Sequence, residues 1–97
     1  MINVLVTIEV KDFDFLTSFE CKANEIMGTH GGKIASAFET KRNEDNSGQE
    51  VHLLEFPNEK SFSEYRSDPR LAKLIDLRNQ AISSIDVTTS LKLKTYA

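Results

Sequence analysis

The residue types that can do acid–base chemistry in this chain are few, and two of them stand at predicted element ends. His30 closes a predicted helix and Glu55 closes a predicted strand. Imidazole titrates near neutral pH, and burial raises the pKa of a carboxyl group, so both side chains can transfer a proton. Each also has a structural alternative. His30 can stabilise the helix end, where a positive charge suits the helix dipole, and Glu55 can form an ion pair with Lys33, Arg66 or Arg78.

Two arginines and a tyrosine supply the binding chemistry. Arg66 and Arg78 lie on either side of Asp68-Pro69. On a shared face they can hold a carboxylate through paired hydrogen bonds. Otherwise they are solvated helix residues whose stems pack on apolar neighbours. Tyr65 fits a core position with its hydroxyl at an edge. We therefore take His30 and Glu55 as candidate catalytic residues, and Tyr65, Arg66 and Arg78 as candidate ligand-binding residues.

The other reactive residue types favour structural roles. His52 has no partner at a recognisable spacing and is interpreted as an ordinary strand histidine. Cys21 is the single cysteine, which excludes an intrachain disulfide and suits a reducing cytoplasm. It also lacks a nearby cation that would favour a reactive thiolate. The sequence contains no metal-ligand spacing, phosphate-binding glycine loop, nucleophile elbow or dinucleotide fingerprint. We therefore expect no metal and no cofactor of the NAD, flavin or ATP type.

Composition limits the partners and the location. The chain has 97 residues and a net charge of −3, with basic residues scattered among acidic ones. Nucleic-acid binding requires clustered Lys and Arg, so we expect no nucleic-acid partner. No stretch approaches the roughly 20 apolar residues that cross a bilayer, and Met1–Val10 does not resemble a signal peptide. The sequence therefore predicts one cytoplasmic domain over residues 1–97 with no membrane contact.

Hydrophobic periodicity predicts the element order β-α-β-β-α-β. Apolar residues alternate along the first strand, recur every three or four positions along the first helix, and alternate again in the later strands. Gly31-Gly32 ends the first helix and turns the chain back. The predicted elements are a strand at 2–10, a helix from Asp12 or Asp14 to His30, strands at 33–41 and 50–56 joined by a polar loop, a helix that begins after Asn58 and is interrupted at Asp68-Pro69, and a strand at 85–93.

This order is that of the α+β ferredoxin-like fold, in which an antiparallel four-stranded sheet carries both helices on one face. The opposite face is too apolar to remain in water. Leu5 lies there, with either Leu53 or the pair Leu54 and Phe56, depending on the register of the third strand. A second copy packed sheet to sheet would cover this face, so the sequence predicts a homodimer of the dimeric α/β-barrel type.

The junction residues carry a resemblance to a known family. The chain resembles the domain-of-unknown-function 1330 family, within the group of dimeric α/β barrels that includes antibiotic-biosynthesis-type monooxygenases and muconolactone isomerases. The resemblance covers nearly the whole chain. It rests on Asp12 after the first strand, the His30-Gly31-Gly32 turn, and the run from Glu55-Phe56-Pro57 through Tyr65, Pro69 and Leu74 to Arg78.

The resemblance implies the dimeric fold and a ligand site between sheet and helices, but no particular activity. Arg66, Arg70 and Leu71 stand where that family often has an aromatic, an acidic and a second aromatic residue, so any pocket here is less aromatic and more cationic. We interpret the protein as a homodimeric binding or assembly module. The alternative is a cofactor-independent enzyme, monooxygenase-like or isomerase-like, that acts on a small organic acid or aromatic metabolite.

Overall fold

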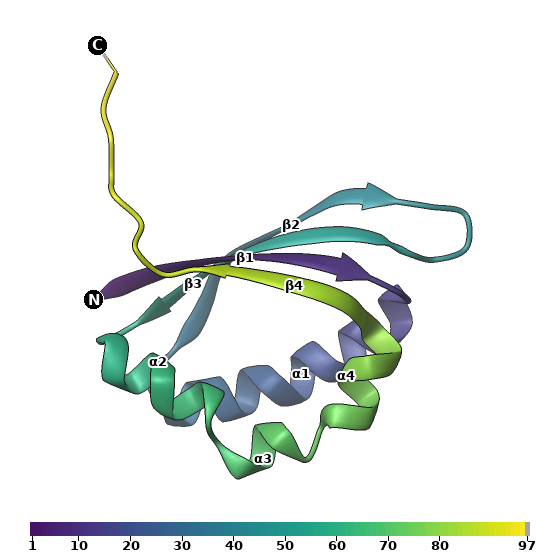
Figure 1. Cartoon of the computed structure of the whole chain (residues 1–97), viewed down its shortest axis with the longest axis horizontal. Coiled ribbons are helices and arrows are strands. Elements are labelled where there is room, and N and C mark those ends of the chain that lie inside the picture. Colours follow the sequence, from purple (N-terminus) through teal and green to yellow (C-terminus); the bar gives the residue numbers. More distant parts are fainter. Residues whose placement is uncertain (97) are drawn as a thin grey trace.

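The structure, a computed structural model, describes residues 1–96, and Ala97, the last residue of the predicted domain, lies outside the described residues. Figure 1 shows the helices gathered on one face of a single sheet, with the other face uncovered. In chain order the elements are β1 (Ile2–Val10), α1 (Phe13–Thr29), β2 (Lys33–Arg42), β3 (Gly48–Phe56), α2 (Glu59–Arg66), α3 (Pro69–Ala72), α4 (Ile75–Ala81) and β4 (Ile82–Thr88).

The sheet confirms the predicted ferredoxin-like topology. Its four strands run in the order β2-β3-β1-β4, and each neighbouring pair is antiparallel. The two central strands, β1 and β3, supply most of the sheet's buried apolar residues. On the helix side, Val4, Val6 and Ile8 of β1 pack against the helices, and all are at least nine-tenths buried. The edge strands are β2 and β4.

Helix ends are set by the predicted capping residues. Of the two aspartates that could begin α1, Asp12 is the cap: its carboxylate accepts hydrogen bonds from the backbone amides of Asp14 and Phe15. At the other end Gly31 has a φ of 75°, a left-handed conformation that glycine adopts without a side-chain clash. The predicted turn after the first helix is therefore confirmed.

The second helical region is interrupted where the sequence predicts it. The Asn58 side chain caps α2, and the Asp68 carboxylate caps α3 by accepting from the Arg70 amide. Pro69 stands in the first turn of α3, where its missing amide hydrogen has no helical partner to lose. This break turns the chain, and α3 and α4 continue along the same side of the sheet (Figure 1).

The register of β3 decides between the two alternatives left open for the helix-free face. Leu54 and Phe56 are buried on the helix side, at 5% and 0% exposure. Leu53 therefore points to the helix-free face, where it lies directly opposite Leu5 in the β1–β3 ladder.

A bulge in β2 adds to the helix-free face a residue that alternation alone does not place there. The pairing with β3 shifts between Ile34 and Ser36, so Ile34 faces the helices, whereas Phe38 lies on the opposite face beside Val51. Phe38 is 63% exposed. We call Leu5, Phe38, Val51 and Leu53 the outer patch.

The last strand differs from its predicted range of 85–93, because β4 begins and ends earlier. A register shift lets Ile82 pair with Val10 and Ile85 pair with Ile8, so both isoleucines face the helices across the Ser83-Ser84 pair. Pairing with β1 ends at Thr88. Residues 89–96 lie outside the sheet, although their apolar alternation continues (Figure 1).

Candidate functional site

A cavity of about 230 Å³ lies between the helix side of the sheet and the helices. Most of its wall is apolar and comes from both layers, including Val6, Ile8 and Leu54 from the sheet and Phe19, Phe62 and Leu71 from the helices. Small apolar cavities with a few converging polar groups are the usual form of ligand sites. We therefore take this cavity as the candidate functional site.

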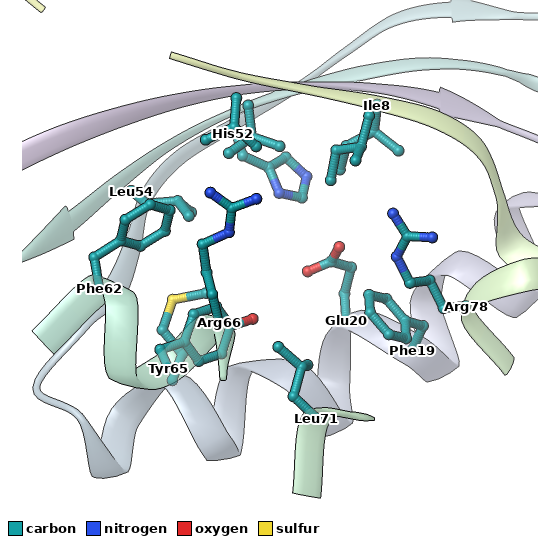
Figure 2. A pocket seen from close by; sticks show the side chains of 14 residues that line it. Ile8, Phe19, Glu20, His52, Leu54, Phe62, Tyr65, Arg66, Leu71 and Arg78 are labelled. Carbon is teal, nitrogen blue, oxygen red and sulfur yellow. The ribbon is translucent and has the colours of Figure 1, made fainter. Parts of the chain in front are cut away.

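Five polar side chains line the cavity and come from four different elements. Glu20 lies on α1, His52 on β3, Tyr65 and Arg66 on α2, and Arg78 on α4. Figure 2 shows the Glu20 carboxylate, the His52 ring and both guanidinium groups pointing into the same space. Only the fold brings these residues together, since they span most of the sequence.

Glu20 is the carboxylate of the cavity. Burial raises its pKa above the ordinary value, the nearby charge of His52 lowers it by a smaller amount, and the charge of Glu50 raises it again. Among residues 1–96, no basic side chain lies within 4 Å of the Glu20 oxygens. The carboxylate therefore remains available to a molecule that enters the cavity.

His52 is held in place by its neighbour on the same face of β3. Its Nε2 atom donates a hydrogen bond to Oε1 of Glu50 at 2.9 Å, and its side chain is only 5% exposed. A carboxylate can only accept, so this contact assigns the hydrogen to Nε2 and fixes the ring orientation. The His52 ring thus forms an oriented polar part of the cavity roof.

Tyr65 joins the core to the cavity. Its ring packs at 5.6 Å from Phe56, centroid to centroid, and its hydroxyl points toward the cavity (Figure 2). Burial, together with the charge of Glu20, raises the pKa of the Tyr65 hydroxyl above its ordinary value. The hydroxyl therefore stays protonated at neutral pH and can donate a hydrogen bond.

The two arginines share the cavity despite the helix break between them. Arg66 lies over the face of Phe62, with 5.5 Å between the guanidinium carbon and the ring centroid. Arg66 is exposed, whereas Arg78 is partly buried. Arg78 therefore lies in a drier environment, where its charge interacts more strongly with an anion.

His30 lies away from the cavity lining, in a structural cluster. Its Nε2 donates to Oδ2 of Asp68 at 2.8 Å, and Arg70 donates to the same oxygen at 2.8 Å. The Arg70 and His30 contacts hold the pKa of the Asp68 carboxyl well below its ordinary value. His30 thus ties the end of α1 to the cap of α3.

Glu55 also lies away from the cavity. It alternates with the buried residues Leu54 and Phe56, so its side chain is on the helix-free face, where it pairs with Lys33 at 3.4 Å. The structure thus brings Tyr65, Arg66 and Arg78 together at the cavity and does not bring His30 or Glu55 there. The acid–base residues that it adds are Glu20 and His52.

Both added residues had a signal in the sequence. Glu20 stands within the apolar stripe of α1, four positions after Leu16 and three before Ala23, so it is a charged residue on the buried face. His52 is in phase with Leu54 and Phe56. This spacing places His52 on the cavity side of the sheet only when the buried face of β3 is known.

Residues 1–96 contain neither a metal-ligand cluster nor a membrane-spanning helix. No group of three or more His, Cys, Asp or Glu side chains is arranged to hold a metal ion. No helix there is long and apolar enough to cross a membrane.

The architecture defines a ferredoxin-like α+β protein, and the comparisons with solved structures agree. A protein of unknown function from Rhodopseudomonas palustris matches with a TM-score of 0.75 and 16% identity, over 97% of this chain and 83% of that chain. A NIPSNAP domain protein from Burkholderia xenovorans matches with a TM-score of 0.69 and 10% identity, over 100% of this chain and 99% of that chain. No protein-family model and no curated protein sequence matches the chain.

A third similar structure is that of an enzyme. SnoaB, a cofactor-independent oxygenase from Streptomyces nogalater, matches with a TM-score of 0.66 and 6% identity, over 95% of this chain and 94% of that chain. At these identities the comparisons show a shared fold of the NIPSNAP and antibiotic-biosynthesis-monooxygenase type.

Proposed function

We propose that the protein binds a small organic anion with an apolar or aromatic body in the cavity between sheet and helices. The observation that carries this proposal is the convergence of Arg66 and Arg78 on a small, largely apolar cavity. A guanidinium group binds a carboxylate with charge-assisted hydrogen bonds, and the apolar wall gains from covering a hydrocarbon or aromatic body.

Phenylacetate is a suitable probe because it has one carboxylate and one aromatic ring. We expect Arg78→Met to weaken phenylacetate binding about 10- to 100-fold in isothermal titration calorimetry, since a hydrogen bond to a charged group contributes roughly 1.5–3 kcal/mol. Arg66→Met should have a smaller effect, because Arg66 is more exposed. Lys22→Met is the matched control, since Lys22 is an exposed cation on α1 outside the cavity lining.

The ligand offers a second control. Phenylacetamide has a similar shape without the charge and should bind at least 10-fold more weakly than phenylacetate to the unaltered protein. Equal affinity for the two compounds, or unchanged affinity in Arg78→Met, would contradict anion binding in this cavity.

We further propose that the protein is a homodimer formed through the helix-free face of the sheet. The outer patch supports this proposal, because Leu5 and Phe38 remain 36% and 63% exposed although they flank the half-buried Val51 and Leu53. Burial of neighbouring apolar side chains on an open sheet face by a second copy lowers the free energy of the assembly. A two-fold dimer brings the same patch from both copies together.

Leu5→Asp should dissociate this dimer, since it places a charge in the middle of the outer patch. Sedimentation velocity at micromolar concentration should give a dimer for the unaltered chain and a monomer for Leu5→Asp. Phe15→Asp is the matched control, because Phe15 is 41% exposed on the outer surface of α1. A monomeric unaltered chain would remove the dimer from the proposal and leave the cavity argument intact.

A cytoplasmic location and membership of the domain-of-unknown-function 1330 family belong to the same proposal. The location is supported by the single cysteine, Cys21, which is free and exposed. The family is supported by the junction residues quoted above and by the ferredoxin-like fold.

The second candidate function is a cofactor-independent enzyme, oxygenase-like or isomerase-like. One observation favours it: the cavity holds an unpaired carboxylate, Glu20, beside the oriented His52 ring. Structural similarity to a cofactor-independent oxygenase is consistent with this candidate.

A further inference from the structure

We propose that the cavity catalyses proton transfer at carbon in an organic acid that carries an enolisable carbonyl group, with Glu20 as the base. This inference rests on the proposed binding function, because the anion must first occupy the cavity. It assigns a substrate class, the 2-oxo acids with an apolar or aromatic body, and it assigns roles to Glu20, Tyr65, Arg66 and Arg78.

Glu20 is the carboxylate best placed to accept the proton. The other buried or half-buried carboxylates are already engaged: Asp68 has Arg70 and His30, Glu55 has Lys33, and Glu50 has His52. Asp12 is the cap of α1 and accepts from backbone amides. Glu20 has no basic partner among residues 1–96, and its side chain points into the cavity (Figure 2). Burial also moves its pKa toward neutrality, where a carboxylate is a more effective general base.

The other polar groups of the cavity can stabilise the charge that forms. When Glu20 removes a proton from the carbon next to the carbonyl, the C–H electron pair forms a carbon–carbon double bond and the carbonyl π pair moves to oxygen. The Tyr65 hydroxyl, which remains protonated, can donate a hydrogen bond to this enolate oxygen. Arg66 and Arg78 hold the substrate carboxylate and lower the energy of the additional negative charge.

The reaction is balanced without an oxidant, a reductant or a cofactor. Glu20 gains the proton and then returns it, either to the enolate oxygen, which gives the enol, or to the same carbon, which restores the substrate. In heavy water the carboxyl proton on Glu20 exchanges with solvent deuterium, and return to carbon then introduces deuterium into the substrate. The proton transfer can therefore be measured even where the substrate and the product are identical.

Phenylpyruvate is the test compound, because it combines a carboxylate, an enolisable carbonyl and an aromatic ring. Proton NMR with the full chain near neutral pD measures its exchange of hydrogen for deuterium at C3, and calorimetry measures its affinity. The unaltered protein should accelerate exchange at least 10-fold over buffer. Glu20→Gln should lower the protein-dependent rate at least about 100-fold, the lower end of general-base contributions, and should change the dissociation constant less than about 3-fold.

The control and the outcomes separate this inference from the binding proposal. Glu64→Gln removes an exposed carboxylate on α2 and should leave both rate and affinity unchanged. Saturable binding of phenylpyruvate without accelerated exchange would overturn the inference and leave the binding function standing, as would unaltered exchange in Glu20→Gln. Absence of phenylacetate binding would overturn the binding function itself. Circular dichroism of Glu20→Gln and of Glu20→Asp checks that a lost rate is not lost folding.

Discussion

Gly48→Ala is expected to destabilise the protein by about 3 kcal/mol or more, the upper range for forcing extra atoms into a packed interior. Gly48 begins β3 and pairs with Val10 on one side and Arg42 on the other. A Cβ atom there would overlap the backbone carbonyl oxygen of Lys41, and it would lie 2.9 Å from the ring of Phe13. Relief would require the β2–β3 ladder to move, because a backbone atom cannot rotate away as a side chain can.

Thermal unfolding measures this effect. A loss of 3 kcal/mol corresponds to a fall in Tm of roughly 12 °C or more in a domain of this size. Gly28→Ala is the matched control: Gly28 lies in α1, and an added Cβ meets no atom within 4 Å. Alanine is the better helix former by about 0.5–1 kcal/mol, so this control should raise Tm slightly. A Gly48→Ala protein that melts like the unaltered chain would contradict the close approach at this strand start.

Phe56→Ala should cost about 3–5 kcal/mol, as expected for removal of a fully buried aromatic ring. Phe56 is 0% exposed and contacts Phe62 edge to face at 5.1 Å, between ring centroids. Its ring also packs against Tyr65, so the substitution removes support from a cavity residue as well as from the core. Chemical denaturation should show the loss as a lower midpoint.

Phe15→Ala makes the same chemical change at a position that is 41% exposed, and it should cost less than about 1 kcal/mol. If the variant at position 56 folds at low temperature, its phenylacetate affinity should fall although Phe56 itself does not line the cavity. Similar stabilities for the two alanine variants would contradict the assignment of Phe56 to the centre of the core.

The local signals in the sequence predicted the element order and most of the element ends. Capping residues such as Asp12, Asn58 and Asp68 act within three residues of their own position, so sequence spacing contains the relevant physics. The end of β4 was predicted wrongly because alternation continues to Leu93, whereas strand pairing depends on a partner strand and on a covering helix layer. Those two requirements are not local.

The candidate site was predicted only in part, because its residues also come together through contacts that are not local in the sequence. Tyr65, Arg66 and Arg78 were chosen by residue type, and the structure places all three on the cavity. Glu20 was passed over because a single acidic residue in an apolar helix stripe is uninformative until the opposite wall is known. Which residues meet across the layers depends on the register of β3 and on the direction that the chain takes after the break at Asp68-Pro69, and local spacing determines neither.

The alternation of β3 has a consequence for the way this chain can change during evolution. Successive residues of one strand serve different surfaces: Val51 and Leu53 belong to the outer patch, and His52 and Leu54 line the cavity. Insertion or deletion of one residue inside β3 would exchange the two sets and expose the cavity residues to the outside. Homologous chains should therefore keep the length of this strand constant, and differences in length should gather in the adjoining loop at 43–47.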